Sequence, residues 1–169
     1  SDLVTGVQTC ALPICAIYKA RPDVMSVIHS HSPAVIPFGV TGARLRPICH
    51  MSGFLGATTP VFDIRHSAGE STDLLVSSQK LGEALATVLG QANVALMRGH
   101  GSVTVGNSIQ QAVFRAVYTE SNARLQMQAA QLGAIEFLTE GEAQATSDMN
   151  DMHLDRPWQM WKRKAMAMA

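Results

Sequence analysis

Helix-like and strand-like segments alternate along this chain, and this alternation limits its fold more than any other feature. Apolar residues at helical spacing, followed by a glycine, predict a helix over residues 79–89. A longer helix is predicted from Ser108, its N-cap, to Leu132 just before Gly133. Apolar and β-branched runs predict strands over residues 24–29, 61–64, 94–97 and 102–105. We therefore expect an α/β fold in which helices cover both faces of a sheet.

Shorter helices are expected at three further places. Residues 16–20 have the pattern of a helix end, because Pro22 follows and proline does not continue a helix. A Ser–Pro pair predicts a short helix over residues 32–39, with Ser32 as the N-cap. Capping-box spacing predicts another helix over residues 139–145.

Composition excludes several classes of protein. A chain of 169 residues fits one domain, and 47% hydrophobic with only 15% charged residues excludes a disordered chain. The balance of 13 basic and 13 acidic residues argues against a nucleic-acid partner. No apolar run is long enough to cross a membrane, and no signal peptide is recognisable, so we expect a cytoplasmic protein.

The first segment of the chain does not look native. Residues 4–14 read VTGVQTCALPI, which matches one translated frame of a common sequencing adaptor. We therefore interpret residues 1–15 as adaptor-derived and residues 16–169 as a partial, N-terminally truncated domain; the alternative is a native N-terminal strand. Without that segment Cys49 is the remaining cysteine, so no disulfide framework is expected.

Three histidines occur where predicted strands end. His29 and His31 are two positions apart, so their side chains leave the same face of a sheet. His100 lies between two glycines, which permit close approach of the backbone. Three imidazoles with an open coordination position are typical of a catalytic zinc site, so we expect these three to be metal ligands. The alternative is a chance histidine pair and an ordinary tight glycine turn.

Three further residues are candidates for a role in a reaction. His50 lies in an irregular stretch and could donate a proton, since the pKa of histidine is near neutrality. Arg46 and Arg98 could each bind a substrate carboxylate in a bidentate manner. The alternatives are a surface or packing role for His50 and pairing with acidic neighbours for the arginines.

These motifs together resemble those of the class II aldolase/adducin family. The resemblance is carried by IYKARPDV at residues 17–24, VIHSHSP at 27–33 and LMRGHG at 96–101, and it extends over about residues 16–145. HSPAVIPFGV at residues 31–40 and HMSGFLG at 50–56 are more similar to its decarboxylase branch. That branch acts on hydroxylated aromatic or pyridine dicarboxylates, or on ring-cleavage products.

The resemblance implies a fold and a metal. It implies a three-layer α/β/α fold with a central mixed, largely antiparallel sheet, and a homotetramer with sites between subunits. His29, His31 and His100 would bind a divalent metal, which is Zn, or Mn or Co in some members. The family also uses a glutamate upstream of these histidines as acid/base, and that position falls near Cys10. The chain therefore departs from the family pattern there, and as written it is expected to be a poor enzyme.

The function implied is a metal-dependent carbon–carbon lyase that decarboxylates a hydroxylated carboxylic acid. Its partner would be a small-molecule carboxylate substrate. One alternative is a sugar-phosphate aldolase or epimerase of the same family, although the early glycine and serine loops that hold phosphate are absent. Another alternative is a non-catalytic, adducin-like binding module.

Overall fold

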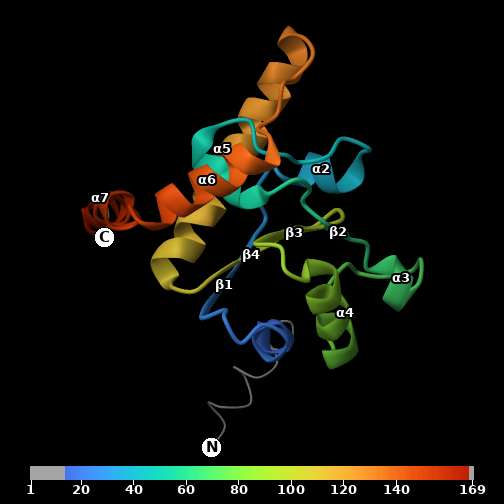
Figure 1. The fold of residues 1–169 in the computed structure, drawn as a ribbon. Coiled ribbons are helices and arrows are strands. Elements are labelled where there is room, and N and C mark those ends of the chain that lie inside the picture. Colours follow the sequence, from blue (N-terminus) through green and yellow to red (C-terminus); the bar gives the residue numbers. More distant parts are fainter. Residues whose placement is uncertain (1–13, 168–169) are drawn as a thin grey trace, which may run out of the picture.

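The computed structural model describes residues 14–167, and within that range the strands form one sheet (Figure 1). The strands are β1 (Ser26–Ser30), β2 (Val61–Phe62), β3 (Val94–Met97) and β4 (Gly101–Gly106). In space they lie in the order β1-β4-β3-β2. β4 runs antiparallel to β1 and to β3, whereas β2 runs parallel to β3. The sheet is therefore mixed and largely antiparallel, which confirms the predicted fold class.

Helices and one 3-10 helix connect and flank these strands. They are α2 (Ile36–Val40), the 3-10 helix η1 (His50–Leu55), α3 (Arg65–Ala68), α4 (Gln79–Leu89), α5 (Ile109–Leu132), α6 (Glu140–Asp151) and α7 (Asp155–Met166). α4 and α5 have the predicted bounds. The hydroxyl of Ser108 accepts a hydrogen bond from the backbone N–H of Gln111 and so caps α5, as predicted.

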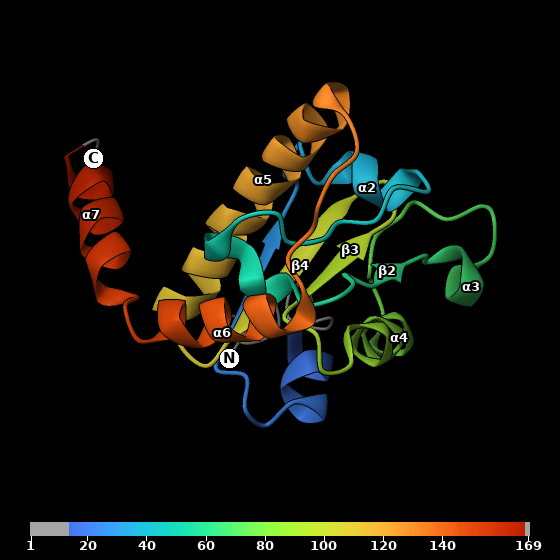
Figure 2. The same cartoon turned by 45° about the horizontal axis from the view of Figure 1, so that its top comes forward.

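Both faces of the sheet are covered, because successive side chains of β3 point to opposite sides. Ala95 and Met97 belong to an apolar cluster with Leu85 and Leu89 of α4. Their neighbours Val94 and Leu96 belong to a second cluster, to which α2, η1 and α5 contribute Phe38, Phe54 and Phe114. Figure 2 shows α2 and α5 on one side of the sheet and α4 on the other. The three predicted layers are therefore present.

The short helix after β1 is the clearest error of the sequence-based expectations. It begins at Ile36 rather than at Ser32, and Val35 occupies its N-cap position. The backbone N–H groups of Val35 and Ile36 both donate to the carbonyl of Ser32, which forms a turn before the helix. The Ser32 hydroxyl is buried and has no hydrogen-bond partner. Ser32 therefore shapes the turn through its backbone and does not cap the helix.

β1 begins at Ser26 rather than at residue 24, and β4 extends one residue beyond each predicted end; α6 and β2 also differ from the predictions. α6 has the predicted capping box at Thr139 but continues to Asp151, six residues beyond the predicted end at 145. The side-chain amide of Asn150 donates to the carbonyl of His50 at 2.7 Å, so packing against η1 holds the added turns. β2 covers only two residues, fewer than the predicted 61–64. The extension of α6 therefore arises from a contact between segments far apart in the sequence.

Two amide side chains of α5 hold the irregular segment before η1. Gln126 accepts a hydrogen bond from the N–H of Arg46 at 3.0 Å and donates to the carbonyl of Arg44 at 2.7 Å. Asn122 accepts from the N–H of Ile48 at 3.0 Å and donates to the carbonyl of Arg46 at 2.7 Å. The backbone of residues 44–48 thus finds in one helix the partners that a neighbouring strand would provide.

The two ends of the described range differ in how they pack. The predicted adaptor segment, residues 1–15, lies outside the described residues except for Ile14 and Cys15, which are helical, as is the chain that follows up to Ala20. That end is where the sequence predicted it, whereas the adaptor interpretation stays a prediction. At the other end α7 packs Trp161 against the second apolar cluster, and the ring centroids of Trp161 and Phe114 of α5 are 6.4 Å apart. Among the helices of residues 14–167, none has the length and apolar character that a membrane crossing requires.

Candidate metal centre

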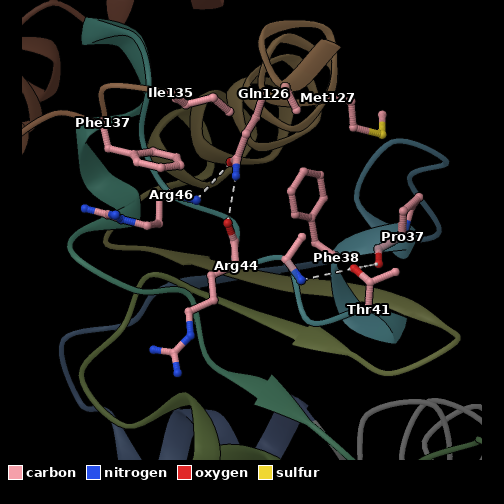
Figure 3. Close-up of a pocket in the computed structure, with 11 residues that line it drawn as sticks. Pro37, Phe38, Thr41, Arg44, Arg46, Gln126, Met127, Ile135 and Phe137 are labelled. Atoms are coloured by element: carbon pink, nitrogen blue, oxygen red, sulfur yellow. Dashed lines mark hydrogen bonds between the residues drawn. The ribbon is translucent and has the colours of Figure 1, made fainter. Parts of the chain in front are cut away.

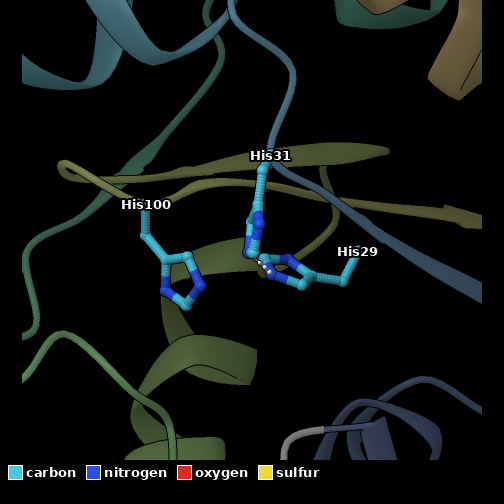
Figure 4. A group of neighbouring side chains, drawn as sticks. All are labelled: His29, His31 and His100. Carbon is cyan, nitrogen blue, oxygen red and sulfur yellow. Dashed lines mark hydrogen bonds between the residues drawn. The ribbon is translucent and has the colours of Figure 1, made fainter.

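Three imidazole rings meet at one edge of the sheet (Figure 4). The ring centroids of His29 and His31 are 4.7 Å apart, and His100 lies 4.8 Å from each of them. One nitrogen from each ring can be chosen so that all three lie within 4.8 Å of one another. The structure therefore brings together the three histidines that the sequence singled out.

Strand pairing explains why these rings converge. His29 lies in β1 opposite Val103 of β4, and His31 follows the end of β1 on the same face. β3 and β4 are joined by a tight turn that carries His100, and Met97 of β3 pairs with Gly101 of β4. Because β4 lies between β1 and β3, the turn reaches the edge where β1 ends.

Glycine is required at two positions of this turn. Gly99 has a φ of 67° and Gly101 a φ of 154°, both in the region that side chains disfavour. A Cβ atom on Gly101 would overlap the carbonyl oxygen of Ser30 and lie 3.1 Å from the Cα atom of His31. The close approach of β4 to the end of β1 therefore depends on the missing side chain.

Backbone carbonyls fix the orientation of two of the rings. Nδ1 of His29 lies 3.0 Å from the carbonyl oxygen of Ser102, and Nδ1 of His100 lies 2.9 Å from that of Leu74. A carbonyl only accepts, so in each ring Nδ1 carries the proton and Nε2 has a free lone pair. Nε2 of His29 lies 2.9 Å from Nε2 of His31. The ring nitrogens that could bind a metal therefore face a common centre.

This donor set fits a divalent transition-metal ion. Neutral imidazole nitrogens suit Zn, and a hydrogen bond from the second ring nitrogen to a carbonyl is the usual support for such a ligand. Although part of His29 is exposed, the loss of water around its ring lowers the pKa of this histidine below the ordinary value. The hydrogen bond to Ser102 opposes that shift, and the charges of His100 and His31 add to it. The neutral form, which can bind a metal, is therefore favoured at His29.

Arg98 is two residues before His100 in the sequence and has an acidic partner. Its Nε is 3.6 Å from Oδ2 of Asp63, and its side chain is partly exposed. Asp63 also receives hydrogen bonds from Nε and Nη2 of Arg65, the latter at 2.6 Å. The structure thus shows the pairing with an acidic neighbour that the sequence left open for Arg98.

The same ion pair gives a pH-dependent contribution to stability. Hydrogen bonds from Arg65 lower the pKa of Asp63 to about 2. Desolvation raises this pKa and so opposes the shift in part. A carboxyl whose pKa is lowered on folding stabilises the protein above its unfolded pKa of about 4, and this contribution is lost as the pH falls toward 2. Arg65 is 34% exposed, so solvent screens the pair. We expect Asp63→Asn to lower the unfolding free energy at pH 7 by about 1 kcal/mol.

Urea unfolding at pH 7, 4 and 2.5 checks this expectation. The difference between Asp63→Asn and the unchanged protein should shrink as the pH falls. Glu136→Gln, which removes an exposed carboxylate that lies outside the helices and strands, is the control and should change little. A constant difference at all three pH values would contradict the assignment to ionised Asp63.

The other two candidates lie in cavities that none of the three histidines lines. His50 opens η1, is exposed, and lines a cavity of about 950 Å³ between η1, α5, α6 and α7. Arg46 lines a cavity of about 470 Å³ together with Phe38 and Phe137 (Figure 3). Its guanidinium carbon lies 4.1 Å from the centre of the Phe137 ring, a cation–π contact. The chain by itself therefore does not bring His50 or Arg46 to the histidine cluster.

Two backbone groups at this centre could not be found from the sequence. Ser102 and Leu74 act through their carbonyl oxygens, which every residue has. No pattern of side chains marks them, and only the strand order and the loop path place them beside the imidazoles.

Comparison with known proteins assigns the family. Residues 6–127 match the family model described as the class II aldolase and adducin N-terminal domain. The decarboxylase tropJ of Talaromyces stipitatus is 38% identical over 169 residues, 88% of this chain and 64% of that protein. A 3,4-dihydroxyphthalate decarboxylase of Terrabacter sp. is 32% identical over 122 residues, 69% of this chain and 48% of that protein.

The fold agrees with this assignment. The crystal structure of an aldolase II superfamily protein from Pseudomonas syringae matches with a TM-score of 0.71 at 22% identity, over 91% of this chain and 60% of that one. The chain thus spans less than two thirds of the length of these relatives. Since the family match covers most of its residues, the chain belongs to the class II aldolase and adducin family.

Proposed function

We propose that this protein is a divalent-metal-dependent carbon–carbon lyase that decarboxylates a hydroxylated aromatic, pyridine or ring-cleavage carboxylic acid. The observation that carries the proposal is the convergence of His29, His31 and His100 within 4.8 Å. Two of the relatives bear decarboxylase names, and one of those names specifies a dihydroxylated aromatic dicarboxylate. Such a substrate offers a hydroxyl beside a carboxylate, which is a chelating pair.

The three histidines would hold the metal, which we propose to be Zn, or Mn or Co. When bound, the ion would act as a Lewis acid and stabilise the negative charge that develops as CO₂ leaves. The carbonyls of Ser102 and Leu74 keep the Nδ1 protons of two rings in place, so that Nε2 stays available. Three protein ligands leave a coordination position for substrate oxygen.

The remaining roles would fall to Arg98, His50 and Arg46. Decarboxylation breaks a carbon–carbon bond, leaves the electron pair on the substrate carbon and requires a proton there. We assign Arg98 to a second substrate carboxylate, because it is two residues before His100 and partly exposed. His50 would supply the proton and Arg46 would bind a carboxylate at the site of a neighbouring subunit in a homotetramer. Within one chain they line cavities that none of the three histidines lines, so a role for them at this centre requires a second subunit.

Metal-dependent turnover is the test of this function. Protein stripped with a chelator and reloaded with Zn²⁺, Mn²⁺ or Co²⁺ is offered dihydroxylated aromatic dicarboxylates, including 3,4-dihydroxyphthalate, and sugar phosphates. We expect CO₂ release from the dicarboxylates only after reloading. Equal turnover in the stripped protein, or cleavage of the sugar phosphates instead, would contradict the proposal.

The adaptor interpretation adds a second arm to the same assay. We propose that residues 1–15 replace a native segment that carries the family's acid/base glutamate. A version with the native residues, read from the gene upstream of Ala16, should turn over faster than the chain as written. Equal rates would refute both the adaptor interpretation and the role of that glutamate.

A further inference from the structure

Leu74 has an unusual backbone conformation for its residue type. Its φ is 65°, and among the described residues it is the one position other than glycine with a positive φ. This left-handed region is sparsely populated by residues that carry a Cβ, and Asn or Asp accept it more readily than leucine. A conformation of this kind persists only where the surroundings hold it, and such positions cluster at functional sites.

The surroundings of Leu74 show what holds it. Its backbone N–H donates to the hydroxyl of Thr72 at 3.1 Å. Its side chain packs against the apolar cluster under α4. The Cδ1 atom of the same side chain lies 3.4 Å from the position that a Cβ on Gly99 would take. Leu74 is therefore anchored on one side in the core and on the other against the turn that carries His100.

This conformation determines the direction of the Leu74 carbonyl. The carbonyl oxygen of Leu74 lies 2.9 Å from Nδ1 of His100. His29 has an equivalent partner in Ser102, but Ser102 lies in β4 and is paired with β1 and β3. The sheet fixes that carbonyl. The partner of His100 comes instead from the irregular loop between α3 and α4, where no strand pairing fixes it.

We propose that Leu74 is a positioning residue for the metal centre: its left-handed backbone turns the carbonyl onto His100 and thereby sets the proton on Nδ1 and the direction of Nε2. The inference rests on the proposed metal-binding function, and it assigns to the loop of residues 69–77 the orientation of the third ligand. Changes of this kind around a metal-ligating histidine typically alter metal affinity by about 10–100-fold.

Two substitutions separate the backbone of Leu74 from its side chain. Leu74→Ile keeps the apolar volume, but a β-branched residue opposes the left-handed conformation. Leu74→Asn loses the apolar side chain but accepts that conformation. We expect Leu74→Ile to weaken Co²⁺ binding by about 10–100-fold, and Leu74→Asn to change it by less than about 3-fold. Leu75→Ile, an exposed neighbour without a positive φ, is the control and should bind Co²⁺ as the unchanged protein does.

A second measurement needs no metal. Nitrogen-15 NMR of the histidine side chains at pH 8 should show the Nδ1-protonated form of His100 in the unchanged protein and in Leu74→Asn. In Leu74→Ile the two neutral tautomers should mix at His100, while His29 keeps its Nδ1 proton. A merely structural role of Leu74 would alter the urea midpoint without this selective change.

The outcomes distinguish the inference from the function on which it rests. If the unchanged protein binds no Co²⁺, the proposed function fails, while the NMR comparison still decides the role of Leu74. If Leu74→Asn weakens binding and Leu74→Ile does not, the side chain is responsible and the inference is wrong. Should Leu74→Ile fail to fold, Thr72→Val removes the acceptor of the Leu74 N–H and should weaken Co²⁺ binding in the same direction. Unchanged affinity and an unchanged His100 tautomer in Thr72→Val would then overturn the inference.

Discussion

Alanine in place of His31 should lower the affinity for Zn²⁺ by more than about a hundredfold and abolish metal-dependent turnover. Structural zinc sites with four ligands bind with roughly 10–16 kcal/mol, so one ligand contributes roughly 3 kcal/mol. His31 is exposed, and its Nε2 contacts Nε2 of His29. Its removal should therefore change the unfolding free energy by less than about 0.5 kcal/mol. Calorimetric titration with Zn²⁺ and urea unfolding measure the two quantities.

His66→Ala is the matched control for this experiment. His66 is also exposed, but it lies in α3 and is not part of the histidine cluster. Zn²⁺ affinity and stoichiometry should be the same for His66→Ala and the unchanged protein. Loss of binding in both variants, or in neither, would be incompatible with a site built from His29, His31 and His100.

Alanine at Gly101 should destabilise the protein by about 3 kcal/mol or more and also remove metal binding. The new Cβ would collide with the Ser30 carbonyl, and the φ of 154° is unfavourable for alanine. Relief of the collision requires the end of β1 to separate from β4. That movement displaces His31, which directly follows β1 and whose Cα would lie 3.1 Å from the new atom. Urea unfolding and Zn²⁺ titration should therefore change together.

Gly42→Ala provides the comparison for Gly101→Ala. A Cβ on Gly42 would meet no atom within 4 Å, and Gly42 has no positive φ. Its substitution should change the unfolding free energy by less than about 0.5 kcal/mol. If Gly101→Ala kept full stability and full Zn²⁺ affinity, the close approach of β1 and β4 would not control the position of His31.

Features with a local cause could be predicted from the sequence. The bounds of α4 and α5 follow from their caps and closing glycines, which act within one helical turn. The start of α6 follows from its capping box for the same reason. Its end could not be predicted, because it depends on the contact of Asn150 with the carbonyl of His50. The false N-cap at Ser32 has a different origin, since local backbone hydrogen bonds from Val35 and Ile36 form a turn there before the helix.

In the candidate site, too, the features with a local cause could be predicted and those that depend on distant segments could not. The convergence of His29 and His31 follows from the two-residue repeat of a strand, and the glycines around His100 marked a close approach. The sequence did not contain the strand order, so it could not tell which loop faces the rings. The contact of the Leu74 carbonyl with His100 therefore could not be predicted. The positions of His50 and Arg46 in separate cavities could not be predicted either.

The two amides of α5 have a consequence for how this protein can diversify. Gln126 and Asn122 bond the N–H groups of Arg46 and Ile48 and the carbonyls of Arg44 and Arg46, and these bonds use no side chain of residues 44–48. Leu45 and Pro47 are fixed by burial, whereas the side chains of Arg44 and Arg46 are not buried and can be exchanged while the path of the segment stays the same. Single substitutions at these two positions can thus change the chemistry of this surface during evolution while the backbone of the segment keeps its conformation.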